Sequence, residues 1–331
     1  MMNSGSYLFA RRTRLPLLQA CLFSLLVALT RQVAADTARF DDYLSRDDSR
    51  MVAYNPSALD PRAELNHEQL SSTDLQADLN SLRPAFNGLV LYAWHPMVTP
   101  RLLWLADQLG YEAVLLGIWQ PRSAAELDGV IALVRRYQDR MALGIVVGNE
   151  GINFGRYEYT DLQFAADYLR AALGDSVPLT TSEPLVGYRD QRVRDFGDFL
   201  APNIHPAIDR EDLPPAAAAQ WAKDQALSLA RDSGKTVLLK ETGLPRGGKA
   251  IYNPEAQAAF WQAYTDSGLS ETAGDGLAVF KVAFEAFDLP WKAAASGLPI
   301  EAWWGLLDPQ RQTTPAFAVW QQSAAKAGKT D

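Results

Sequence analysis

Short apolar runs alternate with amphipathic stretches along most of this chain, and this alternation limits its fold more than any other feature. The apolar runs predict eight strands, near Met51–Tyr54, Gly88–Tyr92, Ala113–Ile118, Ala142–Val147, Val177–Thr181, Phe199–Ile204, Thr236–Lys240 and Ala278–Ala283. Helical patterns lie between them, at Ser72–Arg83, Pro100–Leu109, Ala124–Arg140, Thr160–Leu173, Ala216–Ser233 and Pro254–Ser267. Apolar strands that each precede an amphipathic helix indicate a parallel sheet covered by helices. Eight such units predict an α/β fold, a (β/α)8 TIM barrel with its reactive groups at the strand ends.

Residues 1–35 have the pattern of a secretory signal peptide. Three arginines within residues 11–14 precede an apolar run over residues 15–29, and small residues at 33–35 come before Asp36. We therefore expect a secreted or periplasmic protein with one domain over residues 36–331. No later stretch has the length and apolar composition of a membrane span, so no membrane association is expected after the signal is removed.

The charge of the mature chain argues against several classes of partner. The leader carries four arginines and no acid, so its removal changes the net charge from −8 to −12. Such a chain repels nucleic acid and anionic lipid, and it suits a neutral ligand. Cys21 is the only cysteine and lies in the leader, so no disulfide is expected. The three histidines have no acidic ligands spaced beside them, so we predict neither a metal nor another cofactor. We expect a monomer.

Two glutamates each follow a predicted strand at the point where it passes into a loop. Glu150 follows the fourth strand and Glu241 follows the seventh. Cleaving a glycosidic bond requires two carboxyls, one protonated to assist the leaving oxygen and one ionised to meet positive charge at the anomeric carbon. Asn149 would hold the adjacent sugar hydroxyl. The alternatives are a turn cap at Asn149, a solvated Glu150, and a loop salt bridge between Glu241 and Lys240, but the coincidence of two strand ends favours catalysis.

Aromatic side chains also gather after the predicted strands, and the chain contains nine tryptophans. Sugar rings stack their C–H faces on aromatic rings, so these side chains are candidates for binding substrate. The candidates are Tyr92, Trp94, Trp119 and Trp291, together with His205 at the end of the sixth strand. An aromatic residue taken singly is more often part of the core, and we predict that role for Phe284 and Phe287.

A series of motifs runs through nearly the whole mature chain. They are Ala53-Tyr54-Asn55-Pro56-Ser57, Tyr92, Gly148-Asn149-Glu150, Asn203-Ile204-His205-Pro206, Glu241-Thr242-Gly243-Leu244-Pro245, the segment from Phe284 to Lys292, and Glu301-Ala302-Trp303-Trp304-Gly305-Leu306. Their order and spacing resemble glycoside hydrolase family 17, the β-1,3-glucanases, in its bacterial branch. The resemblance implies a (β/α)8 barrel with Glu150 as general acid/base and Glu241 as nucleophile of a retaining mechanism. It also implies that Lys292 and Glu301 support the nucleophile or bind sugar hydroxyls, and Glu285, in the same segment as Lys292, is a further candidate for binding substrate.

Three positions depart from that family pattern. Leu244 stands where the family usually has tryptophan, so a stacking platform is missing or comes from elsewhere. Leu289 stands where the family usually has an acid, which is expected to leave Lys292 without its near partner. Arg156 lies two residues later than the pattern predicts. These departures concern the subsites more than the catalytic pair.

We therefore predict an exported retaining glycosidase that cleaves β-1,3-glucan or a related β-glucan, as polysaccharide or oligosaccharide, through a covalent glycosyl-enzyme. The alternatives are a transglycosylase that remodels β-1,3-glucan and a weakly active glucan-binding barrel. A retaining mechanism predicts a separation of about 5–5.5 Å between the carboxyls of Glu150 and Glu241. It also predicts a pKa raised by burial and by charge repulsion at Glu150, and a Glu241 held ionised by hydrogen-bond donors.

Overall fold

The computed structural model describes residues 40–63 and 66–327, so the predicted signal peptide lies outside the described residues. Its strands are β1 (Met51–Ala53), β2 (Gly88–Val90), β3 (Ala113–Ile118), β4 (Ala142–Asn149), β5 (Leu179–Ser182), β6 (Thr236–Leu238), β7 (Ser270–Ala273), β8 (Gly276–Val279) and β9 (Val282–Ala283). The α-helices are α2 (Asn66–Gln69), α3 (Ser72–Leu82), α4 (Thr99–Gln108), α5 (Ala124–Tyr137), α6 (Tyr159–Leu173), α7 (Gln191–Asp195), α8 (Pro206–Asp209), α9 (Pro215–Ser233), α10 (Pro254–Asp266), α11 (Pro290–Ser296) and α12 (Pro315–Ala327). Two 3-10 helices are η1 (Leu185–Arg189) and η2 (Pro299–Ala302).

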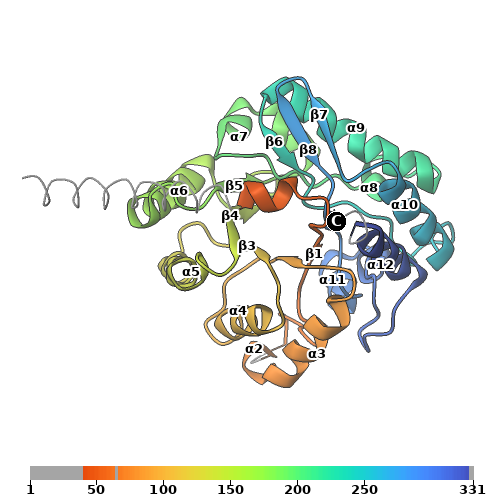
Figure 1. The fold of residues 1–331 in the computed structure, drawn as a ribbon, viewed down its shortest axis with the longest axis horizontal. Helices are drawn as coiled ribbons and strands as arrows, with labels where there is room; N and C mark the ends of the chain where they lie inside the picture. Colours follow the sequence, from red (N-terminus) through yellow and green to blue (C-terminus); the bar gives the residue numbers. More distant parts are fainter. Residues whose placement is uncertain (1–39, 64–65, 328–331) are drawn as a thin grey trace, which may run out of the picture.

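Six parallel strands form a curled sheet in the order β5-β4-β3-β2-β1-β9, with helices around its outer side (Figure 1). The strands β1 to β4 are buried almost throughout, because helices cover one side of them and the interior of the fold covers the other. Parallel strands place their carboxyl ends at one edge of the sheet. The residues after β2, β4 and β5 therefore meet at the same end of the molecule.

The strands and segments that follow β5 in the chain are paired less regularly. A second sheet has the order β6-β8-β7, and only single bridges join the segment 200–203 to its neighbours, at Pro184, Val237 and Glu241. The segment after β8 continues into β9, which pairs with β1. The prediction of parallel strands alternating with helices is confirmed, and the pairing gives a six-stranded curled sheet where eight strands were predicted.

The structure corrects the sixth and the eighth predicted strands. The predicted strand Phe199–Ile204 is wrong as a continuous strand, because Pro202 has no N–H to donate and the segment pairs only at isolated bridges. The predicted strand Ala278–Ala283 is divided into β8 and β9. The antiparallel hairpin of β7 and β8 was not predicted, although the Gly274-Asp275 pair at its two-residue turn is a hairpin signal.

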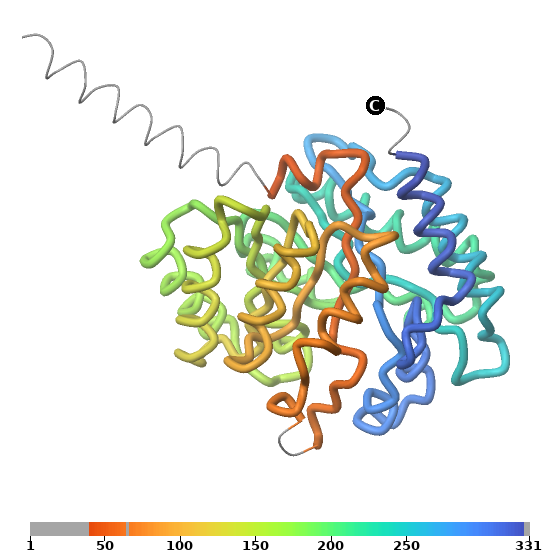
Figure 2. The backbone as a smooth tube through the Cα atoms, turned by 60° about the horizontal axis from the view of Figure 1, so that its bottom comes forward, coloured from red at the N-terminus to blue at the C-terminus, as the bar shows by residue number. Residues whose placement is uncertain are grey.

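Side chains from the first described residues close one end of the sheet interior. Phe40 is fully buried and lies 5.9 Å from Phe199 between ring centroids. Tyr43 is also buried, and its hydroxyl donates to the side-chain oxygen of Asn87 at 2.8 Å. Figure 2 shows this segment at the end of the molecule opposite the loop that contains α2. The strand ends that bear the predicted site residues therefore lie away from this closed end.

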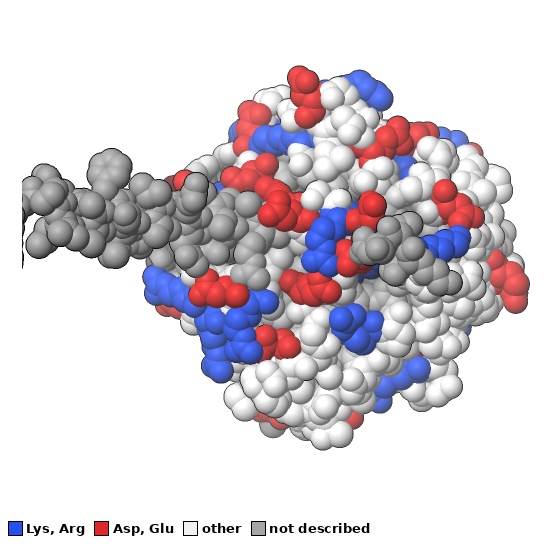
Figure 3. Space-filling view, viewed as in Figure 1, with Lys and Arg blue, Asp and Glu red and all other residues white. Residues whose placement is uncertain are grey.

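The closed end carries charges of both signs. Figure 3 shows Lys and Arg side chains interspersed with Asp and Glu side chains over this face. Among the described residues, no helix is long and apolar enough to cross a membrane.

Candidate active site

The end of β4 turns sharply and brings Glu150 out of the sheet. Gly148 (φ +74°) and Glu150 (φ +57°) both have left-handed backbone, and the pairing of β4 with β5 shifts register at this point. A side chain disfavours this conformation, so glycine suits position 148 and Glu150 is held there by its surroundings. Space also requires glycine, because a β-carbon at position 148 would lie 2.1 Å from the hydroxyl oxygen of Tyr157. The N–H of Glu150 donates to the carbonyl of Ser182 at 2.7 Å and fixes the turn.

Glu241 lies three residues beyond β6 and is held by two basic side chains. The Lys240 ammonium donates to Oε1 of Glu241 at 2.5 Å, and Nε2 of His205 lies 3.3 Å from Oε2. Glu241 is only 5% exposed and Lys240 only 1%. The salt bridge considered from the sequence as an alternative to catalysis is therefore real. It is buried at the strand ends, however, so it is compatible with a reactive role for Glu241.

Asn203 connects the two glutamates through Asn149. Its side-chain nitrogen donates to Oε1 of Glu150 at 2.8 Å and to the side-chain oxygen of Asn149 at 3.2 Å. The Lys240 ammonium donates to that same oxygen of Asn149 at 2.9 Å. The contacts thus form a continuous path from Glu150 through Asn203, Asn149 and Lys240 to Glu241. This path brings both predicted catalytic residues and Asn149 into one cluster.

The two glutamates differ in their affinity for a proton. Burial raises the pKa of Glu150, and the negative charge of Glu241 raises it further. Burial would also raise the pKa of Glu241, but the Lys240 ammonium and the His205 ring outweigh it and hold that pKa well below its usual range. These are the directions predicted from the sequence. One carboxyl therefore retains a proton more readily while its neighbour stays ionised.

His205 and Tyr92 lie beside the same buried carboxylate, Glu241. The ring of His205 packs against Phe284 and Trp304 at centroid distances of 5.0 and 5.1 Å. Burial disfavours the charged imidazole, yet its hydrogen bond to the Glu241 carboxylate and the negative charge of that carboxylate outweigh burial, and the pKa of His205 is raised. Burial and then the charge of Glu241 raise the pKa of Tyr92, whose ring lies 4.7 Å from the Lys240 ammonium. Both side chains predicted to bind substrate thus lie beside Glu241.

A third carboxylate, Glu285, lies close to this cluster. It is 1% exposed and pairs with the Lys292 ammonium at 2.6 Å, while its second oxygen has no hydrogen-bond partner among the described residues. Burial raises the pKa of Glu285 to about 7, with a smaller contribution from the charge of Glu301 on η2. The expectation that Leu289 leaves Lys292 without a near partner is therefore wrong, because Glu285 reaches Lys292 from the preceding loop.

The two leucines that depart from the family pattern are both buried. Leu244 is 4% exposed and Leu289 is 1% exposed. The exposed ring in this neighbourhood is Trp303, which is 40% exposed and has the guanidinium of Arg246 5.1 Å from its centroid. Arg246 in turn pairs with Asp288. Sequence reasoning included Trp303 in a motif but did not identify it as a platform.

The three tryptophans predicted as platforms are half-buried and differ in their surroundings. Trp94 packs against α5, because a β-carbon added to Gly129 would lie 2.0 Å from its ring. One face of Trp119 is covered by the guanidinium of Arg156 at 4.0 Å. Trp291 begins α11 next to Lys292, and its ring nitrogen has no hydrogen-bond partner among the described residues. Their role in binding substrate stays a prediction.

Glu183 is a site residue that sequence reasoning missed. It is fully buried, and its two oxygens accept the backbone N–H groups of Ile152 and Asn153 at 3.0 and 3.1 Å. It therefore anchors the loop that follows Glu150. Burial raises the pKa of Glu183 to about 7. The position of Glu183 just beyond the fifth predicted strand is the same signal that identified Glu150 and Glu241, so the strand-end rule would have found it.

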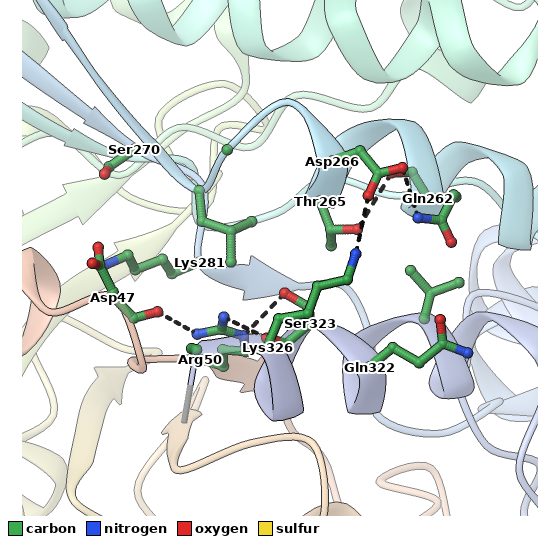
Figure 4. A pocket seen from close by; sticks show the side chains of 14 residues that line it. Asp47, Arg50, Gln262, Thr265, Asp266, Ser270, Lys281, Gln322, Ser323 and Lys326 are labelled. Carbon is green, nitrogen blue, oxygen red and sulfur yellow. Dashed lines mark hydrogen bonds and ion pairs between the residues drawn. The ribbon is translucent and has the colours of Figure 1, made fainter. Parts of the chain in front are cut away.

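A cavity of about 310 Å³ lies elsewhere, between the segment that precedes β1, the end of α10, and α12 (Figure 4). Its buried cations, Arg50 and Lys281, donate to backbone carbonyls of the chain, including those of Asp47 and Leu44. This cavity contains neither predicted catalytic glutamate, and its charged groups support the fold. Within residues 40–63 and 66–327, no three His, Cys, Asp or Glu side chains are grouped so that they could hold a metal ion.

Comparisons with known proteins identify the family of this chain. A family model described as the BtgE/BtgC glycoside hydrolase domain matches residues 52–305. A probable β-glucosidase from Neosartorya fischeri is 29% identical over 190 residues, which cover 55% of this chain and 33% of that protein. A probable β-glucosidase from Aspergillus clavatus is 28% identical over 210 residues, which cover 59% of this chain and 35% of that protein. The chain thus spans about a third of the length of these curated relatives.

Solved structures of two glycoside hydrolase families share the fold. A family 17 β-1,3-glucanosyltransferase from Rhizomucor miehei aligns with a TM-score of 0.64 and 19% identity, covering 82% of this chain and 97% of that chain. A GH5_18 protein from Streptomyces cattleya, solved with GlcNAc, aligns with a TM-score of 0.64 and 18% identity. The alignment covers 86% of this chain and 81% of that chain. At these identities the likeness shows the fold alone. The family model, however, extends over most of the sequence, and the chain therefore belongs to the BtgE/BtgC glycoside hydrolase domain family.

Proposed function

We propose that this protein is an exported retaining β-glycosidase that acts on β-1,3-glucan or a closely related β-glucan. The observation that carries the proposal is the pair Glu150 and Glu241, whose pKa values are shifted in opposite directions and whose carboxyls are linked through Asn203, Asn149 and Lys240. Two neighbouring carboxyls with opposed proton affinities are what a general acid and a nucleophile require.

The proposed reaction has two displacements at the anomeric carbon. In the first, a carboxylate oxygen of Glu241 forms a bond to this carbon while the glycosidic C–O bond breaks, and Glu150 transfers its proton to the departing oxygen. In the second, the ionised Glu150 takes a proton from water while the water oxygen bonds to the anomeric carbon and Glu241 leaves as a carboxylate. The configuration at this carbon is inverted twice and is therefore retained.

Asn149 would bind the sugar hydroxyl next to the anomeric carbon. Its side-chain oxygen already accepts from Lys240 and Asn203, so its amide nitrogen is the group available to donate. Glu285 would accept a further sugar hydroxyl through the oxygen that Lys292 does not hold. Trp119, Trp291 and Glu301 would extend this binding surface.

Several further features support the proposal. The curated relatives are named probable β-glucosidases, and a structural neighbour is a β-1,3-glucanosyltransferase that was also solved with laminaritriose as an active-site mutant. The motif series resembles family 17. We interpret the single bridges beside β5 and β6 as completing an eight-stranded (β/α)8 barrel around the site. The leader pattern of residues 1–35 supports export.

A transglycosylase is the second candidate, and the glucanosyltransferase neighbour favours it. Both reactions use the same glycosyl-enzyme and differ only in whether water or a second sugar accepts the glycosyl group. A glucan-binding barrel without useful turnover is the third candidate.

Incubation of residues 36–331 with laminari-oligosaccharides, followed by chromatography, distinguishes these functions. Shorter products indicate hydrolysis, and longer products indicate transfer. Glu241→Ala should abolish both, because it removes the nucleophile. Unchanged oligosaccharides with the wild-type protein would contradict the enzymatic proposal, and retained affinity for them would then support the binding protein.

A further inference from the structure

Lys240 is the most deeply buried basic side chain in the cluster, and its ammonium has two polar partners there. It donates to Oε1 of Glu241 at 2.5 Å and to the side-chain oxygen of Asn149 at 2.9 Å. Its side chain is 1% exposed. The strand β6 and its continuation hold the backbone, since the N–H of Lys240 donates to the carbonyl of Pro202 at 3.0 Å. The ammonium therefore has little freedom to leave these two partners.

The first contact controls charge. A free carboxylate on Glu241 is stabilised by the ammonium, whereas a Glu241 that is protonated or bonded to a sugar has lost its charge and most of that attraction. His205 adds a second, longer contact at 3.3 Å. The other titratable groups facing Glu241 are Tyr92, whose raised pKa keeps it a neutral phenol, and the carboxyls of Glu150 and Glu285, whose negative charges disfavour a charged Glu241. Lys240 is thus the principal positive charge opposing them.

The second contact controls orientation. An asparagine amide can be turned so that either its oxygen or its nitrogen faces a given neighbour. Because an ammonium only donates, Lys240 requires the oxygen of Asn149 to face it. The Asn203 amide nitrogen imposes the same orientation from the other side. The amide nitrogen of Asn149 is then directed to the remaining side.

We propose that Lys240 is a positioning residue that acts through Glu241 and Asn149: its single ammonium keeps the nucleophile ionised, fixes the Asn149 amide, and stabilises the carboxylate released when the glycosyl-enzyme breaks down. The inference rests on the proposed retaining glycosidase function. In the second displacement the bond between Glu241 and the sugar breaks and its electron pair returns to the carboxylate beside Lys240. The ammonium therefore favours this step.

The test compares Lys240→Met with the matched control Lys223→Met. Lys223 is equally buried at 2% exposed, but its ammonium donates to the carbonyl of Tyr264 and the hydroxyl of Ser267 on the outer helices. The acidic limb of kcat/KM against pH reports the ionisation of Glu241. Removal of Lys240 should raise the pKa of Glu241 and move this limb upward by about one pH unit or more, whereas the control should leave it in place. A limb that does not move in Lys240→Met overturns the proposal.

Breakdown of the glycosyl-enzyme provides a second readout. With an aryl β-glucoside that has a good leaving group, Lys240→Met should release a burst of phenol followed by a slower steady rate, because the second step is slowed. A steady rate equal to that of the wild type would contradict this part of the inference.

Folding and activity are separated by two further measurements. If Lys240→Met does not fold, Lys240→Gln keeps a hydrogen-bond donor, removes the charge, and is tested in the same way. A carbon NMR titration of the Glu241 carboxyl, identified by its loss in Glu241→Gln, needs no turnover. A wild type without glycosidase activity would contradict the proposed function. The Glu241 titration would still decide the Lys240 inference, which fails if the pKa is the same with and without Lys240.

Discussion

At the scale of single residues, the site depends on amide and ammonium groups that hold carboxyls. Asn203 is 1% exposed, and the hydroxyl of Ser182 donates to its side-chain oxygen at 3.0 Å. This contact fixes which end of the Asn203 amide faces Glu150. Its donation to Glu150 opposes the rise in pKa that burial and Glu241 cause. Asn203 therefore adjusts the proton affinity of the proposed acid without taking part in bond formation.

Asn203→Ala should raise the pKa of Glu150, because the donor that stabilises its charged form is lost. The proposed acid must be protonated to act, so the basic limb of kcat/KM should move to higher pH. Maximal activity should fall as well, since Asn149 also loses a partner. Asn153→Ala is the control, because that side chain is exposed and only its backbone N–H has a role in the loop. A basic limb that stays in place in Asn203→Ala would argue against this role.

Sequence reasoning located the two glutamates but not the groups that control them. The strand-end pattern was sufficient for Glu150 and Glu241, since it reports where a side chain leaves the sheet. Lys240 was read only as a loop salt-bridge partner, because a lysine beside a glutamate is usually solvated. Its burial follows from its contact with Asn149, a residue 91 positions away in the chain. Such contacts depend on the closed fold and have no local signal.

At the scale of elements, the end of β4 and the loop after it form one unit. Gly148 permits the turn, Glu183 holds the N–H groups of two loop residues, and the hydroxyl of Tyr157 accepts from the N–H of Gly151 at 3.0 Å. Arg156 covers Trp119 and also donates to the carbonyl of Asn149. These contacts therefore fix the position of Glu150 relative to β4 and β5.

A comparison of Gly148→Ala with Gly155→Ala distinguishes two reasons for a glycine in this unit, a left-handed backbone and a lack of space for a β-carbon. Both glycines have left-handed backbone, so either substitution should cost roughly 1 kcal/mol of stability through conformation alone. Of these two positions, only 148 lacks space for a β-carbon, which would clash with the hydroxyl of Tyr157. Nothing lies within 4 Å of a β-carbon at position 155. Gly148→Ala should therefore lose more stability and most activity, as measured by urea denaturation and glucan turnover. Equal effects of the two substitutions would show that contact with Tyr157 is unimportant.

The elements themselves were predictable where local pattern and tertiary structure agree. The strand Ala113–Ile118 was predicted with the bounds of β3, since its apolar run is uninterrupted and buried. The predicted strand over residues 199–204 failed because Pro202 interrupts the donors of an otherwise apolar segment. The helix α12 was missed although it packs against the rest of the core, with Phe317 and Trp320 buried.

At the scale of the whole molecule, one end of the sheet is closed by core side chains and the other carries the candidate active site. The first described residues close one end with Phe40 and Tyr43, whereas the other end presents the carboxyl cluster. The closing side chains pack on the interior of the sheet, and among the described residues no hydrogen bond or ion pair joins them to Glu150 or Glu241. Stability and chemistry should therefore respond to different substitutions.

Phe40→Ala should lower the free energy of unfolding by about 3–5 kcal/mol, because it removes a fully buried ring and leaves a cavity. The pH dependence of activity below the unfolding temperature should stay that of the wild type. Phe154→Ala is the matched control, since Phe154 is 66% exposed and should change stability little. Chemical denaturation and a pH–rate profile of each variant check both parts. A displaced pH profile in Phe40→Ala would show that the two ends are coupled.

The central claim is that Glu150 and Glu241 perform a double displacement on a β-glucan. Proton NMR of the first product formed from a laminari-oligosaccharide measures this most directly, because the anomers of the new reducing end are resolved before they interconvert. We expect the β-anomer to appear first with the wild-type protein and Glu241→Ala to form no product. Appearance of the α-anomer first would contradict it, since that outcome requires a single displacement by water.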